Sequence, residues 1–317
     1  MDKMLCFMTL PMYQKPLIVK ALSKPGFATR KLRRKVLHIF QDAQRQRQVA
    51  TTPPPLVNEK EIRMVGLRRT GNHALIRWLK RQHAGRFRHL NDIPVYENPF
   101  RHEYEYWCDH YPEYPKEIER IRQESLGNFV PTECLVYNYE DHPLSKIVDS
   151  KFWAKHDMYF GRSQRIYDLI ILRDPFNLLA SRIRRGFLAI KSTQISFVDL
   201  WLEYAKEFLG ETNYLQNEKI CVNYNLWVDN IDYRRELAEK LAMNFTDAGI
   251  DEVSKRAGGS SFDGTEFTGQ AAKMDVHGRW KKLIDDPAYR RLVSNDELFA
   301  YSEKIFGVLP GTEQLRI

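Results

Sequence analysis

The sequence predicts an α/β protein in which helices flank a central parallel sheet, and two strand–turn–helix units carry this prediction. In the first, an apolar run at 62–67 is followed by a glycine-containing turn and by helical spacing at 73–80. In the second, the continuous apolar run 169–172 is typical of a strand buried in a parallel sheet, and a capped helix follows it. With 317 residues, of which 43% are hydrophobic and 28% charged, the chain has the composition of a globular protein with a full core.

Residues 1–56 form a basic N-terminal extension that ends in a Pro-rich linker, and residues 57–317 form the main domain. Two basic clusters, at 31–35 and 44–48, lie in a segment with helical character, and the run TTPPP at 51–55 ends any helix. Such an arm either contacts a partner or an anionic surface, or is a solvated extension packed loosely on the core; we favour the second interpretation.

The turn between Gly66 and Gly71 has the spacing of a phosphate-binding P-loop. Backbone N–H groups of such a loop and of the following helix start converge on one point, where the helix dipole also favours an anion. Asn72 and His73 replace the Lys and Ser/Thr that would reach a terminal phosphate and hold Mg²⁺. Positively charged side chains inside the loop therefore have to supply the charge. A plain strand–turn–helix with surface arginines is the alternative.

The stretch after the first helix lacks a clear period. We expect 87–99 to be a loop that crosses the top of the sheet, because its apolar residues are too interrupted for a strand. Residues 97–130, which are rich in Tyr and Trp, predict a substrate-side insertion, with a packed surface helix as the alternative.

A second strand is predicted at 135–137, and Glu140, Asp141 and His142 come soon after it. Ionisable groups just beyond the carboxyl end of a strand lie where an open α/β sheet keeps its chemistry. His142 or Glu140 could take a proton from an acceptor hydroxyl or amine. A solvated turn would also explain the triplet.

Arg173 ends the strand predicted at 166–172, and Asp174 and Pro175 then begin a helix as its N-cap and first turn. Ser181 lies on the second turn of that helix. An Arg at the strand end and a Ser eight residues later can converge on one phosphate, the first through a planar charged fork and the second through a hydroxyl. A capped helix alone would not explain this spacing.

The rest of the chain predicts an amphipathic helix at 197–209, a strand at 219–224, a helix at 231–243 and a closing helix at 295–306. The glycine- and serine-rich stretch 257–270 predicts a mobile loop.

Composition limits the setting and the partners. The net charge of +8 suits an anionic ligand or polymer. The four cysteines are scattered, without zinc-ligand spacing or disulfide density, which favours a reducing, cytoplasmic compartment. No stretch approaches the ~20 apolar residues of a membrane-spanning helix.

Two motifs resemble those of sulfotransferases. Residues 69–73 with Leu75 (RTGNH-x-L) resemble the family's 5′-phosphosulfate loop, although Asn72 and His73 stand where Thr or Ser is usual. Residues 172–182 (LRDPFNLLASR) resemble its 3′-phosphate motif in residue types and in spacing. The run GRWK at 278–281 resembles a late segment of the family that follows a basic loop over the 3′-phosphate.

This resemblance covers residues 61 to about 307 and implies a three-layer, P-loop-type α/β fold. It implies 3′-phosphoadenosine 5′-phosphosulfate (PAPS) as donor, adenosine 3′,5′-bisphosphate (PAP) as product, and no metal. The acceptor would be a hydroxyl or amine of a small molecule or carbohydrate, not a nucleic acid. The donor-binding candidates are Arg68, Arg69, Thr70, Gly71, Asn72, His73, Arg173, Ser181, Ser260, Lys273 and Arg279. The catalytic candidates are His142 or Glu140 as base, Asp92 as a third choice where some members have a glutamate, and Arg69 beside the leaving oxygens.

Two other classes of function stay open. A P-loop phosphotransferase would need Gly-Lys-Ser/Thr after Gly71 and an acidic metal ligand at a strand end, where Arg173 stands instead. A non-catalytic protein that binds RNA or acidic glycans would explain the net charge of +8 and the basic arm.

Overall fold

The computed structural model describes residues 25–190, 195–253 and 259–316. Contacts divide the chain into two units, Met1–Pro53 and Pro54–Ile317. In the first unit, the described chain forms one helix, α2 (Pro25–Thr51). Of the predicted loop 257–270, residues 257 and 258 lie outside the described residues.

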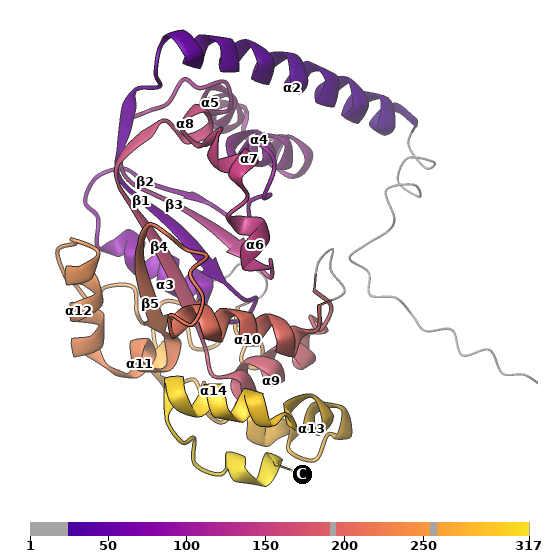
Figure 1. The fold of residues 1–317 in the computed structure, drawn as a ribbon, viewed down its shortest axis with the longest axis vertical. Helices are drawn as coiled ribbons and strands as arrows, with labels where there is room; N and C mark the ends of the chain where they lie inside the picture. The colour runs from indigo at the N-terminus through magenta and orange to yellow at the C-terminus, as the bar shows by residue number, and fades with distance from the viewer. Residues whose placement is uncertain (1–24, 191–194, 254–258, 317) are drawn as a thin grey trace, which may run out of the picture. The chain divides into compact units, whose positions relative to one another are not determined.

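The second unit is built on a five-stranded parallel sheet with the strand order β2-β3-β1-β4-β5 (Figure 1). The strands are β1 (Leu56–Gly66), β2 (Phe87–Leu90), β3 (Thr132–Glu140), β4 (Arg162–Leu172) and β5 (Glu218–Asn223). At its carboxyl end, β1 places Gly66 opposite Glu140 on one side and Ile171 on the other. The residues that follow β1, β3 and β4 therefore meet at one edge of the sheet. This arrangement confirms the predicted α/β fold with a central parallel sheet.

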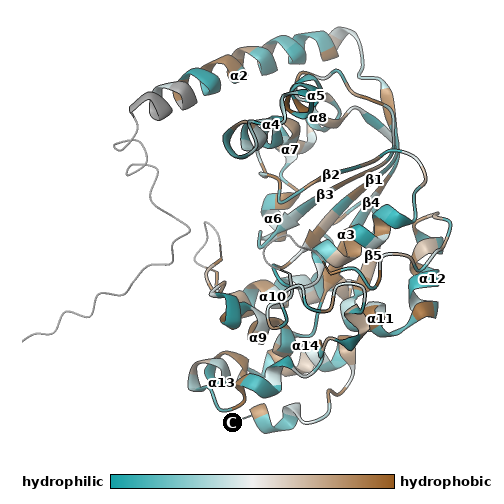
Figure 2. Ribbon diagram, turned by 180° about the vertical axis from the view of Figure 1, so that it is seen from behind, coloured by the Kyte–Doolittle hydropathy of each residue, from teal (hydrophilic) through white to brown (hydrophobic). Residues whose placement is uncertain are grey.

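Helices cover both faces of the sheet, with α3, α11 and α12 on one face and α6 and α10 on the other (Figures 1 and 2). The α-helices of the second unit are α3 (Asn72–Arg81), α4 (Pro99–His110), α5 (Pro115–Ser125), α6 (Leu144–Ile147), α7 (Ser150–Trp153), α8 (His156–Phe160), α9 (Pro175–Arg185), α10 (Phe197–Phe208), α11 (Tyr224–Asp229), α12 (Ile231–Lys240), α13 (Pro287–Val293) and α14 (Asp296–Phe306). Short 3₁₀ helices are η2 (Ala271–Lys273), η3 (Arg279–Leu283) and η4 (Thr312–Leu315). Within the described ranges, no helix is both long and apolar enough to cross a bilayer.

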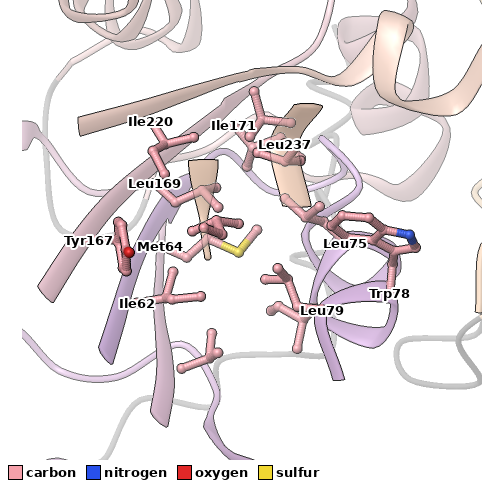
Figure 3. Close-up of a cluster of buried hydrophobic side chains, with 14 of the residues drawn as sticks. Ile62, Met64, Leu75, Trp78, Leu79, Tyr167, Leu169, Ile171, Ile220 and Leu237 are labelled. Atoms are coloured by element: carbon pink, nitrogen blue, oxygen red, sulfur yellow. The ribbon is translucent and has the colours of Figure 1, made fainter. Parts of the chain in front are cut away.

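One large hydrophobic cluster lies between the sheet and the helices α3, α11 and α12 (Figure 3). Alternate residues of β1, Ile62 and Met64, face Leu75, Trp78 and Leu79 of α3, and all five are fully buried. Burying each such side chain contributes about 1.5–3 kcal/mol. This packing fixes α3 against β1 and so fixes the position of the loop between them.

The opposite face of β1 carries charge. The buried Glu61 carboxylate accepts hydrogen bonds from Tyr137 Oη at 2.9 Å and from His156 Nε2 at 2.6 Å. Burial by itself lowers the pKa of His156, but the charges of Glu61 and Asp157 outweigh it and raise that pKa to about 9. Burial likewise opposes ionisation of Glu61, yet its partners lower the pKa of Glu61 overall. The pair is therefore held in its charged form.

The prediction that residues 87–99 form a loop was wrong for the first four residues. Residues Phe87–Leu90 form the edge strand β2, in which Leu90 pairs with Tyr137 of β3. Four residues are too few for a visible alternation, and backbone pairing with β3 decides the conformation. Residues 97–130 contain α4 and α5, each with Pro in its first turn.

Candidate functional site

The loop between β1 and α3 turns tightly over residues 67–71. Arg69 and Gly71 both have positive φ, 73° and 115°, and the Thr70 N–H donates to the Leu67 carbonyl at 3.1 Å. A Cβ on Gly71 would lie 2.1 Å from the Tyr224 ring, so both its φ and its surroundings require glycine there. The ring of Tyr224 thus holds the loop in one shape.

Helix α3 starts directly after this loop and has no side-chain N-cap. Its first N–H groups have no partner inside the helix, and the helix dipole places partial positive charge there. The Asn72 side chain turns back instead, and its Nδ2 donates to the Leu67 carbonyl at 3.2 Å and to Glu140 Oε1 at 2.9 Å. The start of α3 can therefore offer backbone donors to an anion.

Arg173 follows β4 at the same edge of the sheet and is buried. Its guanidinium donates to the Val276 carbonyl and lies 5.1 Å from the centre of the Tyr224 ring. Arg173 Nη1 is 3.5 Å from the Arg69 carbonyl oxygen, so the strand-end arginine adjoins the β1–α3 loop. The next residue, Asp174, accepts the Asn177 N–H at 2.8 Å, which confirms the predicted N-cap of α9.

Ser181 lies one turn further along α9, where its Oγ donates to the Asn177 carbonyl at 2.8 Å. Arg279, from η3, donates through Nη1 to Ser181 Oγ at 3.1 Å and through Nη2 to Ser260 Oγ at 3.0 Å. The structure therefore joins the strand-end motif to the segment around Arg279 and Ser260.

Arg69, Arg173 and Arg279 form what we call the arginine cluster. Burial together with the charges of Arg185 and Arg173 lowers the pKa of Arg69 to about 10. Burial and the charge of Arg173 likewise lower the pKa of Arg279 to about 10. The ion pair between Arg279 and Asp263 is long, at 3.8 Å. The cluster therefore holds repelling charges in a poorly solvated place, an arrangement that a bound anion would relieve.

Buried donors point to the same conclusion. Thr70 Oγ1, Arg173 Nε and Arg279 Nε are buried and have no hydrogen-bond partner within the described part of the chain. Buried polar atoms are normally paired. Three unpaired ones in the loop and the cluster fit a phosphate-rich ligand that accepts several hydrogen bonds.

A second, acidic cluster adjoins the loop around Arg68. Arg68 Nη2 is 3.1 Å from Asp92 Oδ2 and Arg68 Nε is 3.7 Å from Glu140 Oε2. Asp141 accepts the Arg68 backbone N–H at 2.9 Å and a bidentate pair from Arg182 at 2.8 and 3.0 Å. Burial raises the pKa of Glu140 even though Asn72 donates a hydrogen bond to it.

The other predicted residues differ in position. Ser260 is buried and belongs to the Arg279 contacts described above. His73 is half-buried, with its ring edge-on to that of His89 at 6.3 Å. His142 is also half-buried, and its ring lies edge-on to Tyr139 at 6.2 Å. Lys273 has an exposed side chain on η2, so the structure gives it no place among the buried cations.

Several residues of the site were missed by sequence reasoning. Arg185 donates to the Ser260 carbonyl at 2.8 Å, and Arg69 Nε donates to Ser261 Oγ at 2.8 Å. Arg185 lies four residues after Ser181, a helical spacing that could have signalled it. The contact of Tyr224 with Gly71 leaves no signal in the sequence.

No protein-family model and no curated protein matches the chain. Among solved structures, it is similar to the sulfotransferase domain of the olefin synthase of Synechococcus PCC 7002, with 13% identity, a TM-score of 0.49, and coverage of 81% of this chain and 98% of that one. The sulfotransferase domain from the curacin biosynthetic pathway has 13% identity, a TM-score of 0.44, and coverage of 81% and 99%. Mouse sulfotransferase SULT7A1 complexed with PAP has 13% identity, a TM-score of 0.40, and coverage of 82% and 90%. Fold does not by itself imply function, so the site residues have to support any assignment.

Proposed function

We propose that the protein is a sulfotransferase that moves a sulfuryl group from PAPS to a hydroxyl or amine of a small molecule or carbohydrate. The observation that carries this proposal is the arginine cluster, whose buried, mutually repelling guanidiniums adjoin a P-loop-like turn. A nucleotide with one phosphate at each end of its ribose would pair with both parts of such a site. The absence of Lys and Ser/Thr after Gly71 sets the loop apart from those of ATP-dependent enzymes.

The residues present fit this donor. The backbone of residues 69–73, with the start of α3, would hold the 5′-phosphosulfate, and Thr70 Oγ1 would donate to it. Arg173, Ser181 and Arg279 would hold the 3′-phosphate, with Ser260 keeping Arg279 in position. When bound, PAPS supplies an activated sulfuryl group on the 5′-phosphate. Arg69 would stabilise the charge that grows on the leaving oxygens.

Glu140 is the base that we propose. It ends β3, it accepts a hydrogen bond from Asn72 of the phosphosulfate site, and burial raises its pKa. A raised pKa makes the ionised carboxylate a stronger proton acceptor. Arg68 would act as a positioning residue, since it contacts both Glu140 and Asp92. His142 and Asp92 remain the other candidates.

Calorimetric titration of the full chain with PAP, in parallel with ATP plus Mg²⁺, tests the donor site. We expect PAP to bind in the micromolar range and ATP weakly. Ser181→Ala should weaken PAP binding, because it removes a buried hydroxyl without changing the packing, whereas exposed Arg291→Ala serves as a matched control. Mg²⁺-dependent ATP binding without PAP binding would refute the proposal and favour a phosphotransferase.

Turnover then distinguishes an enzyme from a binding protein. PAP release from PAPS should rise when a phenol, amine or sugar acceptor is added. Binding of PAP without any acceptor-dependent release, across these acceptor classes, would contradict the assigned activity.

A further inference from the structure

Helix α2 exposes an apolar face. Leu32, Val36, Ile39 and Phe40 have side chains that are 65%, 47%, 68% and 70% exposed. Their spacing of four, seven and eight residues from Leu32 places them on one side of an α-helix. Along α2, hydrophobic residues stand beside hydrophilic ones (Figure 2). Four large apolar side chains left in water on one stripe mark an interaction surface.

The same helix is strongly basic. Its sequence holds seven Lys or Arg and one Asp, a net charge of +6 out of the +8 of the whole chain. Exposed Arg33 and Lys35 lie on either side of the apolar stripe, and exposed Arg47 lies about two turns beyond its end. The basic side chains and the apolar stripe are therefore presented together, not on separate elements.

The combination of an apolar stripe with basic side chains indicates which kind of partner binds the stripe. The stripe spans only residues 32–40, and no helix in the described part of the chain is apolar enough to cross a bilayer. If a second copy of α2 packed on the stripe, parallel or antiparallel, the basic side chains of the two helices would lie next to one another, and their like charges would repel. A surface of anionic lipid offers both an apolar boundary for the stripe and negative headgroups for its flanks.

We propose that α2 docks the protein on the surface of an anionic membrane. The side chains of Leu32, Val36, Ile39 and Phe40 enter the boundary between headgroups and acyl chains. Arg33, Lys35 and Arg47 contact the headgroups. The proposal concerns the first unit alone and does not depend on the activity proposed above.

The test is flotation of the full chain with phosphatidylcholine vesicles and with vesicles that also contain roughly 30% phosphatidylserine, whose negative surface potential attracts basic segments. We expect binding to the anionic vesicles only, and weaker binding as salt is raised. Arg33→Gln with Lys35→Gln should weaken it about 25-fold, at about fivefold for each charge. Ile39→Ser with Phe40→Ser should weaken it at least ~10-fold through the lost apolar contact. Gln44→Ser with Gln48→Ser, exposed polar changes on the same helix, is the matched control.

Three outcomes would overturn the proposal. One is no binding to anionic vesicles at low salt. The second is an equal loss in the glutamine control, which would mean that the stripe is not specific. The third is a dimer in sedimentation that Ile39→Ser with Phe40→Ser abolishes, because the stripe would then be a contact between copies.

Discussion

Replacing Arg279 by Met should show whether this residue serves ligand binding or the stability of the fold. Met keeps most of the volume but removes the charge. Because the pKa of Arg279 is lowered to about 10 from 12.5, the ligand-free fold carries about 3 kcal/mol of unfavourable charge at this position. The change also removes two charge-assisted hydrogen bonds, to Ser181 and Ser260, worth about 1.5 kcal/mol each because both hydroxyls keep another partner. Without ligand, the two effects nearly cancel, and the stability of the variant should lie within ~1 kcal/mol of that of the parent.

PAP binding should change in the opposite direction. A hydrogen bond to a charged group contributes about 1.5–3 kcal/mol, so the dissociation constant for PAP should rise by roughly 10- to 150-fold. Urea unfolding with and without PAP measures both effects, since a ligand that binds only the folded state raises the free energy of unfolding by RT ln(1 + L/Kd), where L is the free ligand concentration. Arg291→Met, at an exposed position, is the control and should change neither quantity.

The reasoning would be refuted by the reverse pattern. If Arg279→Met lowered the free energy of unfolding by ~2 kcal/mol or more without ligand and left PAP affinity intact, the arginine cluster would be a structural network. The buried guanidiniums would then need another explanation.

Three further predictions concern the base, the loop and pH. Glu140→Gln should lower kcat by ~10²- to 10⁴-fold with little change in PAP affinity, as expected for loss of a general base. If His142→Gln showed such a loss and Glu140→Gln did not, the base would be His142. Gly71→Ala should lower the free energy of unfolding by ~1–3 kcal/mol and weaken PAP binding, because φ is 115° and the new Cβ meets a ring at 2.1 Å. The pKa of His156 is raised to about 9 from 6.5, so the stabilisation from His156 is complete below pH 6.5 and is lost as pH rises through about 9. The pKa of Glu61 is lowered, so the stabilisation from Glu61 is lost as pH falls through the acidic range. Urea midpoints measured across pH should therefore fall at both the alkaline and the acidic end.

Each of these has its own control. Asp92→Asn removes the third candidate for the base, and it should leave most of kcat intact. Gly186→Ala has a positive φ of 69° and a ψ of 27°, near the ψ of 13° at Gly71, but nothing within 4 Å, so it isolates backbone strain from the clash at Gly71. His156→Gln should remove the alkaline limb of the stability profile, and a limb that persists would show that other groups cause it.

Local spacing made much of the fold and of the proposed donor site predictable. The strand end at Arg173, the N-cap at Asp174 and the helix that carries Ser181 lie within one short segment, and steric and capping rules act over that distance. The glycine turn at 66–71 is local in the same way. The apolar run 169–172 likewise predicted a parallel sheet, since strands buried on both faces are mostly apolar, although β1 carries buried Glu61 and Arg63 on one face.

The sequence by itself therefore determined the fold class and which residues lie at the carboxyl ends of β1, β3 and β4. Tertiary structure alone decided which of them meet. The edge strand β2 depends on its pairing with β3, and Lys273 is exposed whereas Arg279 is buried. Arg279 reaches Ser181 across 98 residues, and Tyr224 packs against Gly71. Such contacts depend on how helices pack on the sheet, and no short-range pattern records that packing.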